Sequence, residues 1–112
     1  MKKAAITTHI LNLDSGKPAA NVRVTLHRLD MDAPVARGQT DSDGRIMQWD
    51  TDFELREGDY LLYFAVGEWY AQQDLRSFYP EIQISFHVVN VDEHYHVPLL
   101  LNAYGYSTYR GS

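Results

Sequence analysis

Hydrophobic and polar residues alternate with a period of two in two stretches of the chain, residues 22–26 and 82–88. In the first stretch, valine and leucine alternate with Arg23 and Thr25. This period is typical of a β-strand that has one face in a core and the other in water. Both stretches are therefore predicted to be strands.

A third stretch, residues 60–66, is apolar on both faces, which is typical of a central strand. We expect a core to cover one of its faces and a helix or a partner chain to cover the other. In residues 68–78, the apolar side chains of Ala71, Leu75 and Phe78 recur at intervals of four and three. This spacing predicts a short helix that lies on the sheet and ends before the next proline.

Clusters of Gly, Asp, Asn and Pro separate these stretches and predict turns at residues 14–18, 41–44, 57–59 and 102–105. The cluster at 41–44 is interpreted as a turn rather than a calcium loop, because the later acidic ligands of such a loop are absent. Several short strands with one brief helix favour an all-β, two-sheet β-sandwich over an alternating βαβ design. Residues 1–112 are expected to form a single domain.

The composition excludes several classes of protein. A net charge of −5 without any basic cluster argues against binding to nucleic acid. Because the chain has no cysteine, it has neither disulfides nor a thiolate metal site. No apolar run approaches the roughly 20 residues of a membrane span. Since the N-terminal residues do not resemble a signal peptide, we expect a cytoplasmic location.

Histidine is the side chain most easily poised for proton transfer near neutral pH, and the chain has five. His27 and His87 alternate outward on predicted strands and are interpreted as ordinary surface residues. His9 interrupts a strand-forming run at residues 6–11, where an ionisable group is either functional or a satisfied core histidine. Both interpretations remain open from the pattern alone.

His94 and His96 are two residues apart, so in a strand both rings project from one face. Such a pair can hold zinc, but a catalytic zinc site needs a third protein ligand, from His9 or a distant carboxylate. Arg45 follows the turn at 41–44, and its guanidinium suits a planar substrate with paired oxygens, although a surface arginine is also expected there. The G-x-S-x-G and HExxH motifs of other hydrolases are absent.

The last part of the chain combines an apolar run at residues 97–101 with a polar, tyrosine-rich segment at 104–109. Chain ends fray unless something packs against them, so an ordered terminal strand implies a neighbour. An exposed edge strand readily pairs with a copy of itself. We therefore predict that the chain assembles into oligomers.

These features together resemble the transthyretin-like 5-hydroxyisourate hydrolases. The resemblance covers essentially the whole chain and is carried by five segments, Ile6 to Asn12, Gly16 to Ala19, Asp43 to Arg45, His94 to Leu100 and Tyr104 to Ser112. Its most specific part is Tyr109-Arg110-Gly111-Ser112, which the family places at the extreme C-terminus and which vertebrate transthyretin, the hormone carrier, lacks. The resemblance therefore favours an enzyme over a carrier.

The resemblance implies a transthyretin-like two-sheet β-sandwich that assembles as a homotetramer. Its central channel would be lined by the first strand and the last two strands, and the substrate would bind there between subunits. Catalytic roles fall on His9, His96 and Ser112 by matching motif. Substrate contacts fall on His9, Arg45, His96, Tyr109, Arg110 and Ser112. The chain departs from the family at Asn102-Ala103, where Ser-Pro is common, and this affects only the turn before the last strand.

The implied reaction is hydrolysis of 5-hydroxyisourate to 2-oxo-4-hydroxy-4-carboxy-5-ureidoimidazoline in urate breakdown. Opening the ring needs water, a base for its proton and donors for the developing oxyanion, and none of these requires a metal or cofactor. Two other functions remain open at this point. One is a module that binds a small molecule or hormone, and the other is a zinc-dependent hydrolase that uses His94 and His96.

Overall fold

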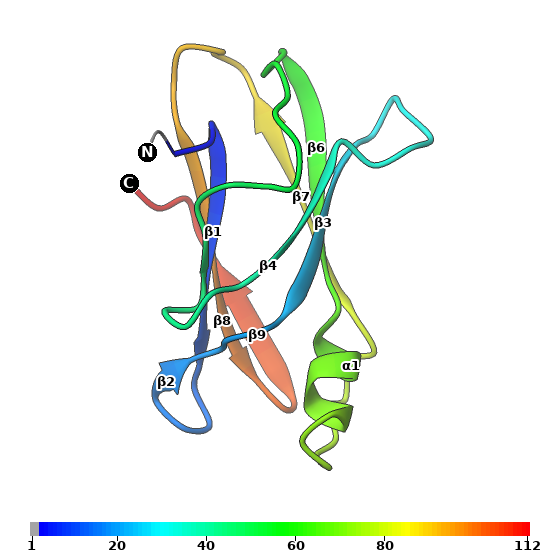
Figure 1. Ribbon diagram of the computed structural model, residues 1–112, viewed down its shortest axis with the longest axis vertical. Coiled ribbons are helices and arrows are strands. Elements are labelled where there is room, and N and C mark those ends of the chain that lie inside the picture. Colours follow the sequence, from blue (N-terminus) through cyan, green and yellow to red (C-terminus); the bar gives the residue numbers. More distant parts are fainter. Residues whose placement is uncertain (1–2) are drawn as a thin grey trace.

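The computed structural model describes residues 3–112, which form two β-sheets that pack face to face (Figure 1). Sheet A contains β1 (Ile6–Asn12), β2 (Lys17–Pro18), β5 (Arg45–Ile46), β8 (Tyr95–Asn102) and β9 (Gly105–Thr108). Sheet B contains β3 (Arg23–Arg28), β4 (Ala36–Gln39), β6 (Gly58–Phe64) and β7 (Ile82–Val88). The predicted all-β sandwich is confirmed.

The order of the strands determines which residues can meet. In sheet A the order is β2-β1-β8-β9, and β5 also pairs with β1. The pair β1 and β8 is parallel, with Thr7 opposite His96 and His9 opposite Pro98. The first strand of the chain therefore lies beside one of the last two, and β1 begins at the same end of sheet A at which the C-terminus lies (Figure 1).

The core lies between the sheets and takes alternate residues from each strand, as the period of two requires. The largest fully buried side chains come from both sheets and from the helix: Tyr60, Tyr70, Phe64, Ile6, Ile10, Leu26, Leu62, Ile82, Leu99, Leu101, Val22 and Val24. The two strands predicted at 22–26 and 82–88 are confirmed as β3 and β7. The predicted central strand is β6, which lies between them in sheet B.

The helix differs from the prediction in both extent and orientation. The described part of the chain has one α-helix, α1 (Val66–Ala71), which starts before the predicted range of 68–78 and already ends at Ala71, inside it. Its buried residues are Val66, Trp69 and Tyr70. Leu75 and Phe78, which were expected to face the sheet, are 54% and 69% exposed. The predicted apolar face was therefore wrong.

The physical reason is that Trp69 and Tyr70 offer more apolar surface than the smaller residues in the predicted stripe. The Trp69 indole N–H donates a hydrogen bond to the Ala20 carbonyl at 2.8 Å, and the Tyr70 hydroxyl donates one to the Asp14 carboxylate at 3.2 Å. These bonds tie α1 to the segment around β2, at one end of the sandwich (Figure 1). The outer side chains of β6 are consequently only half-buried, and α1 does not cover them.

Within residues 3–112, no helix combines the length and the apolar composition that crossing a bilayer would need.

Candidate functional site

The candidate site lies on the outer face of sheet A, where β1, β5 and β8 meet. His9 of β1 is directly opposite Arg45 of β5, so their side chains leave the same face of the sheet. Thr7 is two residues before His9 on that face and lies opposite His96 of β8. The strand pairing thus brings His9, Arg45 and His96 together, although they are far apart in sequence.

The turn before β5 sets the position of Arg45. The Asp41 carboxylate accepts hydrogen bonds from the backbone N–H groups of Asp43 at 2.9 Å and Arg45 at 3.0 Å. Gly44 has a φ of 75°, and a Cβ there would lie 2.5 Å from the Ile10 carbonyl oxygen, so only glycine fits. The interpretation of this segment as a turn is confirmed.

A threonine hydroxyl joins the two histidines of the His94-Tyr95-His96 segment. The Oγ1 atom of Thr7 lies 2.9 Å from Nε2 of His94 and 2.7 Å from Nδ1 of His96. The two rings stack with their centroids 6.5 Å apart, which confirms that they share a face. Thr7 is fully buried and was not predicted as a site residue. Its spacing of two from His9 was the available signal.

Burial and positive charge both favour the neutral form of His9. Burial lowers the pKa of His9 below 6.5, and the nearby Arg45 guanidinium lowers it further. A hydrogen bond to the backbone of Asp43 and the carboxylates of Asp41 and Asp43 raise it, but these effects are smaller. The imidazole of His9 is therefore neutral at pH 7 and has one unprotonated nitrogen.

The same causes act on His96 in β8 and on His94, which comes just before that strand. Burial is the largest effect that lowers the pKa of His96, followed by the charges of Arg45, His94, His9 and Lys3. Burial also lowers the pKa of His94, with a further contribution from Lys3. The strand register places Arg45 and His9 near His96, and their charges therefore act on its pKa. The site therefore offers neutral imidazoles beside a permanent positive charge.

The C-terminal segment packs directly against His96. The Gly111 N–H donates a hydrogen bond to the His96 carbonyl at 2.8 Å. A Cβ on Gly111 would lie only 2.6 Å from Cδ2 of the His96 ring, so a side chain would collide with the imidazole. Ser112 follows immediately and is exposed. The structure thus brings the end of the Tyr-Arg-Gly-Ser segment to the histidine cluster.

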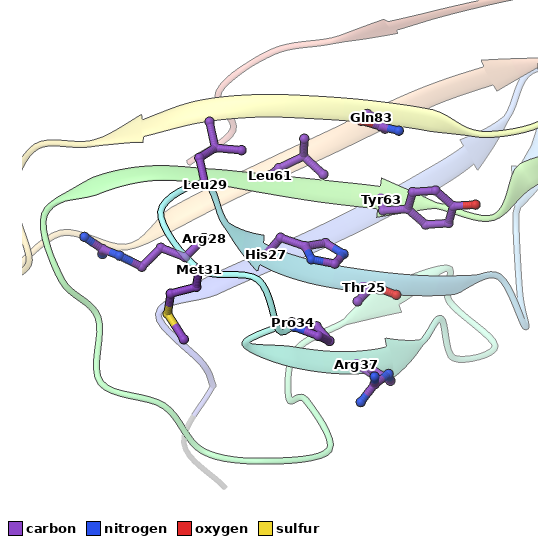
Figure 2. Close-up of a pocket in the computed structure, with 10 residues that line it drawn as sticks. All are labelled: Thr25, His27, Arg28, Leu29, Met31, Pro34, Arg37, Leu61, Tyr63 and Gln83. Atoms are coloured by element: carbon purple, nitrogen blue, oxygen red, sulfur yellow. The ribbon is translucent and has the colours of Figure 1, made fainter.

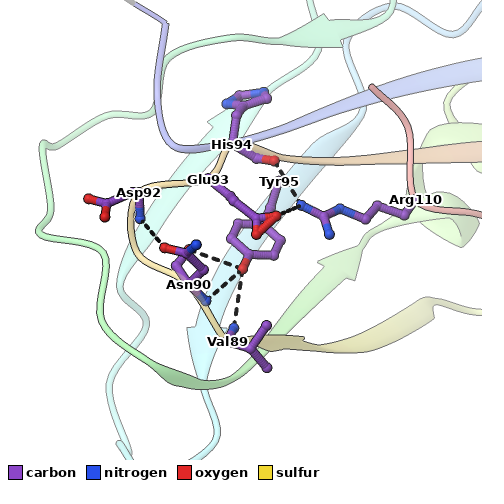
Figure 3. Close-up of polar contacts among 7 residues, drawn as sticks. All are labelled: Val89, Asn90, Asp92, Glu93, His94, Tyr95 and Arg110. Carbon is purple, nitrogen blue, oxygen red and sulfur yellow. Dashed lines mark hydrogen bonds and ion pairs between the residues drawn. The ribbon is translucent and has the colours of Figure 1, made fainter.

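Arg110 holds this segment in place (Figure 3). Its guanidinium lies 4.6 Å from the centre of the Tyr95 ring and donates hydrogen bonds to the Glu93 carboxylate at 3.2 Å and the His94 carbonyl at 3.3 Å. Because Tyr95 alternates with His96 along β8, this guanidinium lies on the other side of the strand from the His96 ring. Tyr109 is 58% exposed. The contacts of Tyr109, Arg110 and Ser112 with substrate remain predictions.

A metal centre would need more ligands than the histidine pair supplies. Among residues 3–112, no three His, Asp or Glu side chains converge closely enough to hold an ion. The described residues of one chain therefore lack the third ligand that a zinc site at His94 and His96 would need.

A hollow lies on the outer face of sheet B (Figure 2). It is lined by Thr25, His27, Arg28, Leu29, Met31, Pro34, Arg37, Leu61, Tyr63 and Gln83. It contains a single histidine, and among the described residues no hydrogen bond or ion pair joins the His27 ring to another side chain. His87, on the neighbouring strand, pairs with Asp59 and its side chain is 80% exposed. This face lacks the convergence seen on sheet A.

Comparison with known proteins agrees with this geometry. Residues 6–111 match the HIUase/Transthyretin family. A 5-hydroxyisourate hydrolase of Salmonella typhimurium is 43% identical over 109 residues, which cover 96% of this chain and 80% of the relative. The structure of Klebsiella pneumoniae 5-hydroxyisourate hydrolase is 36% identical, with a TM-score of 0.84 over 96% of this chain and 98% of that one.

The fold also occurs in a protein that was solved with a bound thyroxine molecule. Sea bream transthyretin in complex with thyroxine has a TM-score of 0.88 over 96% of this chain and 95% of that chain, at 24% identity. At this level of identity the likeness shows the fold alone. With the match over residues 6–111 and the similarity to the Salmonella and Klebsiella proteins, it follows that this chain belongs to the HIUase/Transthyretin family.

Proposed function

We propose that this protein is a 5-hydroxyisourate hydrolase, which converts 5-hydroxyisourate to 2-oxo-4-hydroxy-4-carboxy-5-ureidoimidazoline in urate breakdown. The observation that carries the proposal is the convergence of His9, Arg45 and His96 on one face, with Gly111 packed against His96. The relatives in Salmonella and Klebsiella bear the name of this activity. Each element of the proposed site has a role in the chemistry.

The reaction adds water across one C–N bond of the six-membered ring and yields a carboxylate and a ureido group. The water must lose a proton as its oxygen attacks the ring carbonyl, and the carbonyl oxygen then becomes an oxyanion. The ring nitrogen must gain a proton as it leaves. A base, an acid and a donor for the oxyanion are therefore sufficient.

The side chains on sheet A provide these groups without a metal. His9 and His96 are neutral at pH 7 because burial and Arg45 lower their pKa values, so each can accept a proton. We assign them to position and deprotonate the water. Arg45 binds the substrate's oxygens through its fixed set of donors. The Ser112 or Tyr109 hydroxyl completes the polar wall of the site.

We place the substrate at an interface between subunits of a homotetramer. The supporting observation is that His9, Arg45 and His96 lie on an outer sheet face beside the edge strand β9. Tyr106 in β9 is 42% exposed, and Tyr104 and Tyr109, which flank the strand, are 77% and 58% exposed. An open edge with exposed aromatic groups is a surface on which copies associate. Sizing with light scattering should give four times the chain mass of 12.9 kDa. A stable monomer would contradict this placement.

The activity itself is tested by following the ultraviolet absorbance of freshly generated 5-hydroxyisourate. The protein should accelerate its decay far beyond the spontaneous rate, and prior treatment with a chelator should leave that rate unchanged. Decay that is no faster with protein than without it would reject the hydrolase and favour a binding protein of the same fold. Loss of activity on chelation, with stoichiometric metal in the untreated protein, would favour the zinc-dependent alternative.

A further inference from the structure

The hydroxyl of Thr7 lies between two imidazoles and contacts both within hydrogen-bond distance, at 2.9 Å from Nε2 of His94 and 2.7 Å from Nδ1 of His96. Because Thr7 is fully buried, its hydroxyl is shielded from competing water. A hydroxyl has one proton to donate and lone pairs with which to accept. With a single proton, it can donate to only one of the two histidines, so if it donates to one ring the other ring must donate to it.

The surroundings of His94 set the direction of this chain of hydrogen bonds. The backbone of Ala4 raises the pKa of His94, although burial lowers it more, and a backbone carbonyl has this effect where the ring N–H points toward it. Since Nε2 faces Thr7, the nitrogen left for Ala4 is Nδ1. A neutral ring has one N–H, so Nε2 of His94 is an acceptor and receives the Thr7 proton. Thr7 then accepts the N–H of Nδ1 of His96.

We infer that Thr7 and His94 are positioning residues that hold His96 in its Nδ1–H tautomer, so that Nε2 of His96 is the base that deprotonates the hydrolytic water. The geometry of the three side chains carries this inference, and its catalytic consequence rests on the proposed hydrolase function. A partner that fixes the tautomer of a catalytic histidine through its second nitrogen is a general device in hydrolases.

The proposed step balances with the groups at hand. Nε2 of His96 takes a proton from water while the water oxygen forms a bond to the ring carbonyl carbon. The imidazolium that forms is stabilised because its Nδ1–H still donates to Thr7, which donates to His94. When the C–N bond breaks, the proton on Nε2 passes to the leaving nitrogen, and the neutral Nδ1–H tautomer is restored.

His9 provides an instructive contrast. The backbone of Asp43 raises the pKa of His9, and no side-chain substitution removes this backbone group. The partner of His96 is a side chain, so its effect on the tautomer can be removed and restored. Thr7→Val retains the shape of the side chain and removes the hydroxyl, and Thr7→Ser restores the hydroxyl. Thr8→Val is a matched control, because Thr8 is equally buried but donates to the Val97 carbonyl instead.

The test combines nitrogen NMR of isotope-labelled protein without substrate, which reports the tautomer of each histidine, with kinetics of 5-hydroxyisourate decay. We expect His96 to bear its proton on Nδ1 in the wild type, Thr7→Ser and Thr8→Val. In Thr7→Val the proton should move substantially to Nε2. The same variant should lose about tenfold in kcat, with little change in KM, because Thr7 does not reach the substrate.

The inference is overturned if the wild type already has its proton on Nε2 of His96. It is also overturned if Thr7→Val changes neither the tautomer nor kcat. An inactive wild type with the expected tautomer pattern would reject the proposed function and leave the role of Thr7 in setting the tautomer intact. The spectroscopic and kinetic measurements therefore distinguish the two failures.

Discussion

The two outer faces of the sandwich are built by the same alternation of residues, and both carry histidines, yet they differ in what surrounds each ring. On sheet A, His94 and His96 share the Thr7 hydroxyl, and His9 lies opposite Arg45. On sheet B, His27 borders an open hollow and His87 pairs with the exposed carboxylate of Asp59. One face therefore holds several imidazoles near a guanidinium, and the other holds isolated ones.

The difference arises from topology. The strands of sheet B pair only in the antiparallel sense. The side chains on its outer face are therefore set by the alternation within each strand. In sheet A, the parallel pairing of β1 with β8 and the addition of β5 to β1 bring together segments from the beginning, the middle and the end of the chain. A catalytic site needs several groups at one point, and such non-local pairing supplies them.

Substitution of the histidines on each face should show the largest difference in activity between the two sheets. A general base typically contributes 100- to 10,000-fold to a rate, so His96→Ala and His9→Ala should each lower kcat for 5-hydroxyisourate by roughly that factor. His27→Ala and His87→Ala, on sheet B, should retain the activity of the wild type. Stopped-flow absorbance of all four variants tests this. Equal losses on the two faces, or none on sheet A, would contradict the assignment of the site.

The arginines offer the next comparison. Arg45 lies opposite His9, whereas Arg37 borders the hollow on sheet B. A hydrogen bond to a charged group contributes about 1.5–3 kcal/mol, so Arg45→Gln should lower kcat/KM by roughly 10- to 100-fold. Arg37→Gln should leave kcat/KM unchanged. If Arg37→Gln were the more damaging substitution, the substrate would be bound on the other face.

The pH dependence of kcat/KM should reflect the lowered pKa values of the histidines on sheet A. Because burial and Arg45 lower the pKa of His9 and His96 below 6.5, kcat/KM should stay on its plateau at pH 7. Below the lowered pKa values it should fall about tenfold for each pH unit. Arg45→Gln removes a charge that lowers both pKa values, so its acidic limb should shift to higher pH. An acidic limb centred above pH 7 in the wild type would contradict this expectation.

The same pKa values have a consequence for stability. The unfolded chain has ordinary histidines and binds protons near pH 6.5, before the folded chain does. The free energy of unfolding should therefore be highest above this pH and decrease as the pH falls through 6.5 toward the lowered values. Denaturant titrations across this range should show a smaller decrease for His96→Ala, which lacks one of the groups.

Much of the fold and part of the site could be predicted from the sequence. Burial of one strand face makes apolar and polar residues alternate with a period of two, and this pattern is visible locally. The stretch that is apolar on both faces located the central strand β6, and the period of two located β3 and β7. It also placed His94 and His96 on one face. The helix face was mispredicted because spacing alone does not weigh Trp69 and Tyr70 against smaller residues.

The remaining features depend on contacts between segments that are distant in sequence. The role of Thr7 follows from its register opposite His96, which no local pattern records. The motif predicted a substrate contact for Arg110, but the contacts of its guanidinium within the chain are with Glu93, His94 and Tyr95. Motif resemblance indicated the candidate site residues, but only the pairing of strands shows how each is held.

The smallest expected effect concerns the glycine that allows the C-terminal segment to lie against His96. In Gly111→Ala the new methyl group would lie 2.6 Å from Cδ2 of the imidazole, so either the ring or the segment must shift. Overpacking of this kind costs about 1 kcal/mol, which corresponds to a factor of roughly five in an equilibrium or rate constant. We therefore expect kcat/KM to fall by about that factor. Gly105→Ala is the control, because its new methyl group would be in ordinary contact with Asn102 at 3.5 Å. If the two variants were equally active, the contact of the C-terminal segment with His96 would have no part in positioning the ring, and the site would consist of the strand residues alone.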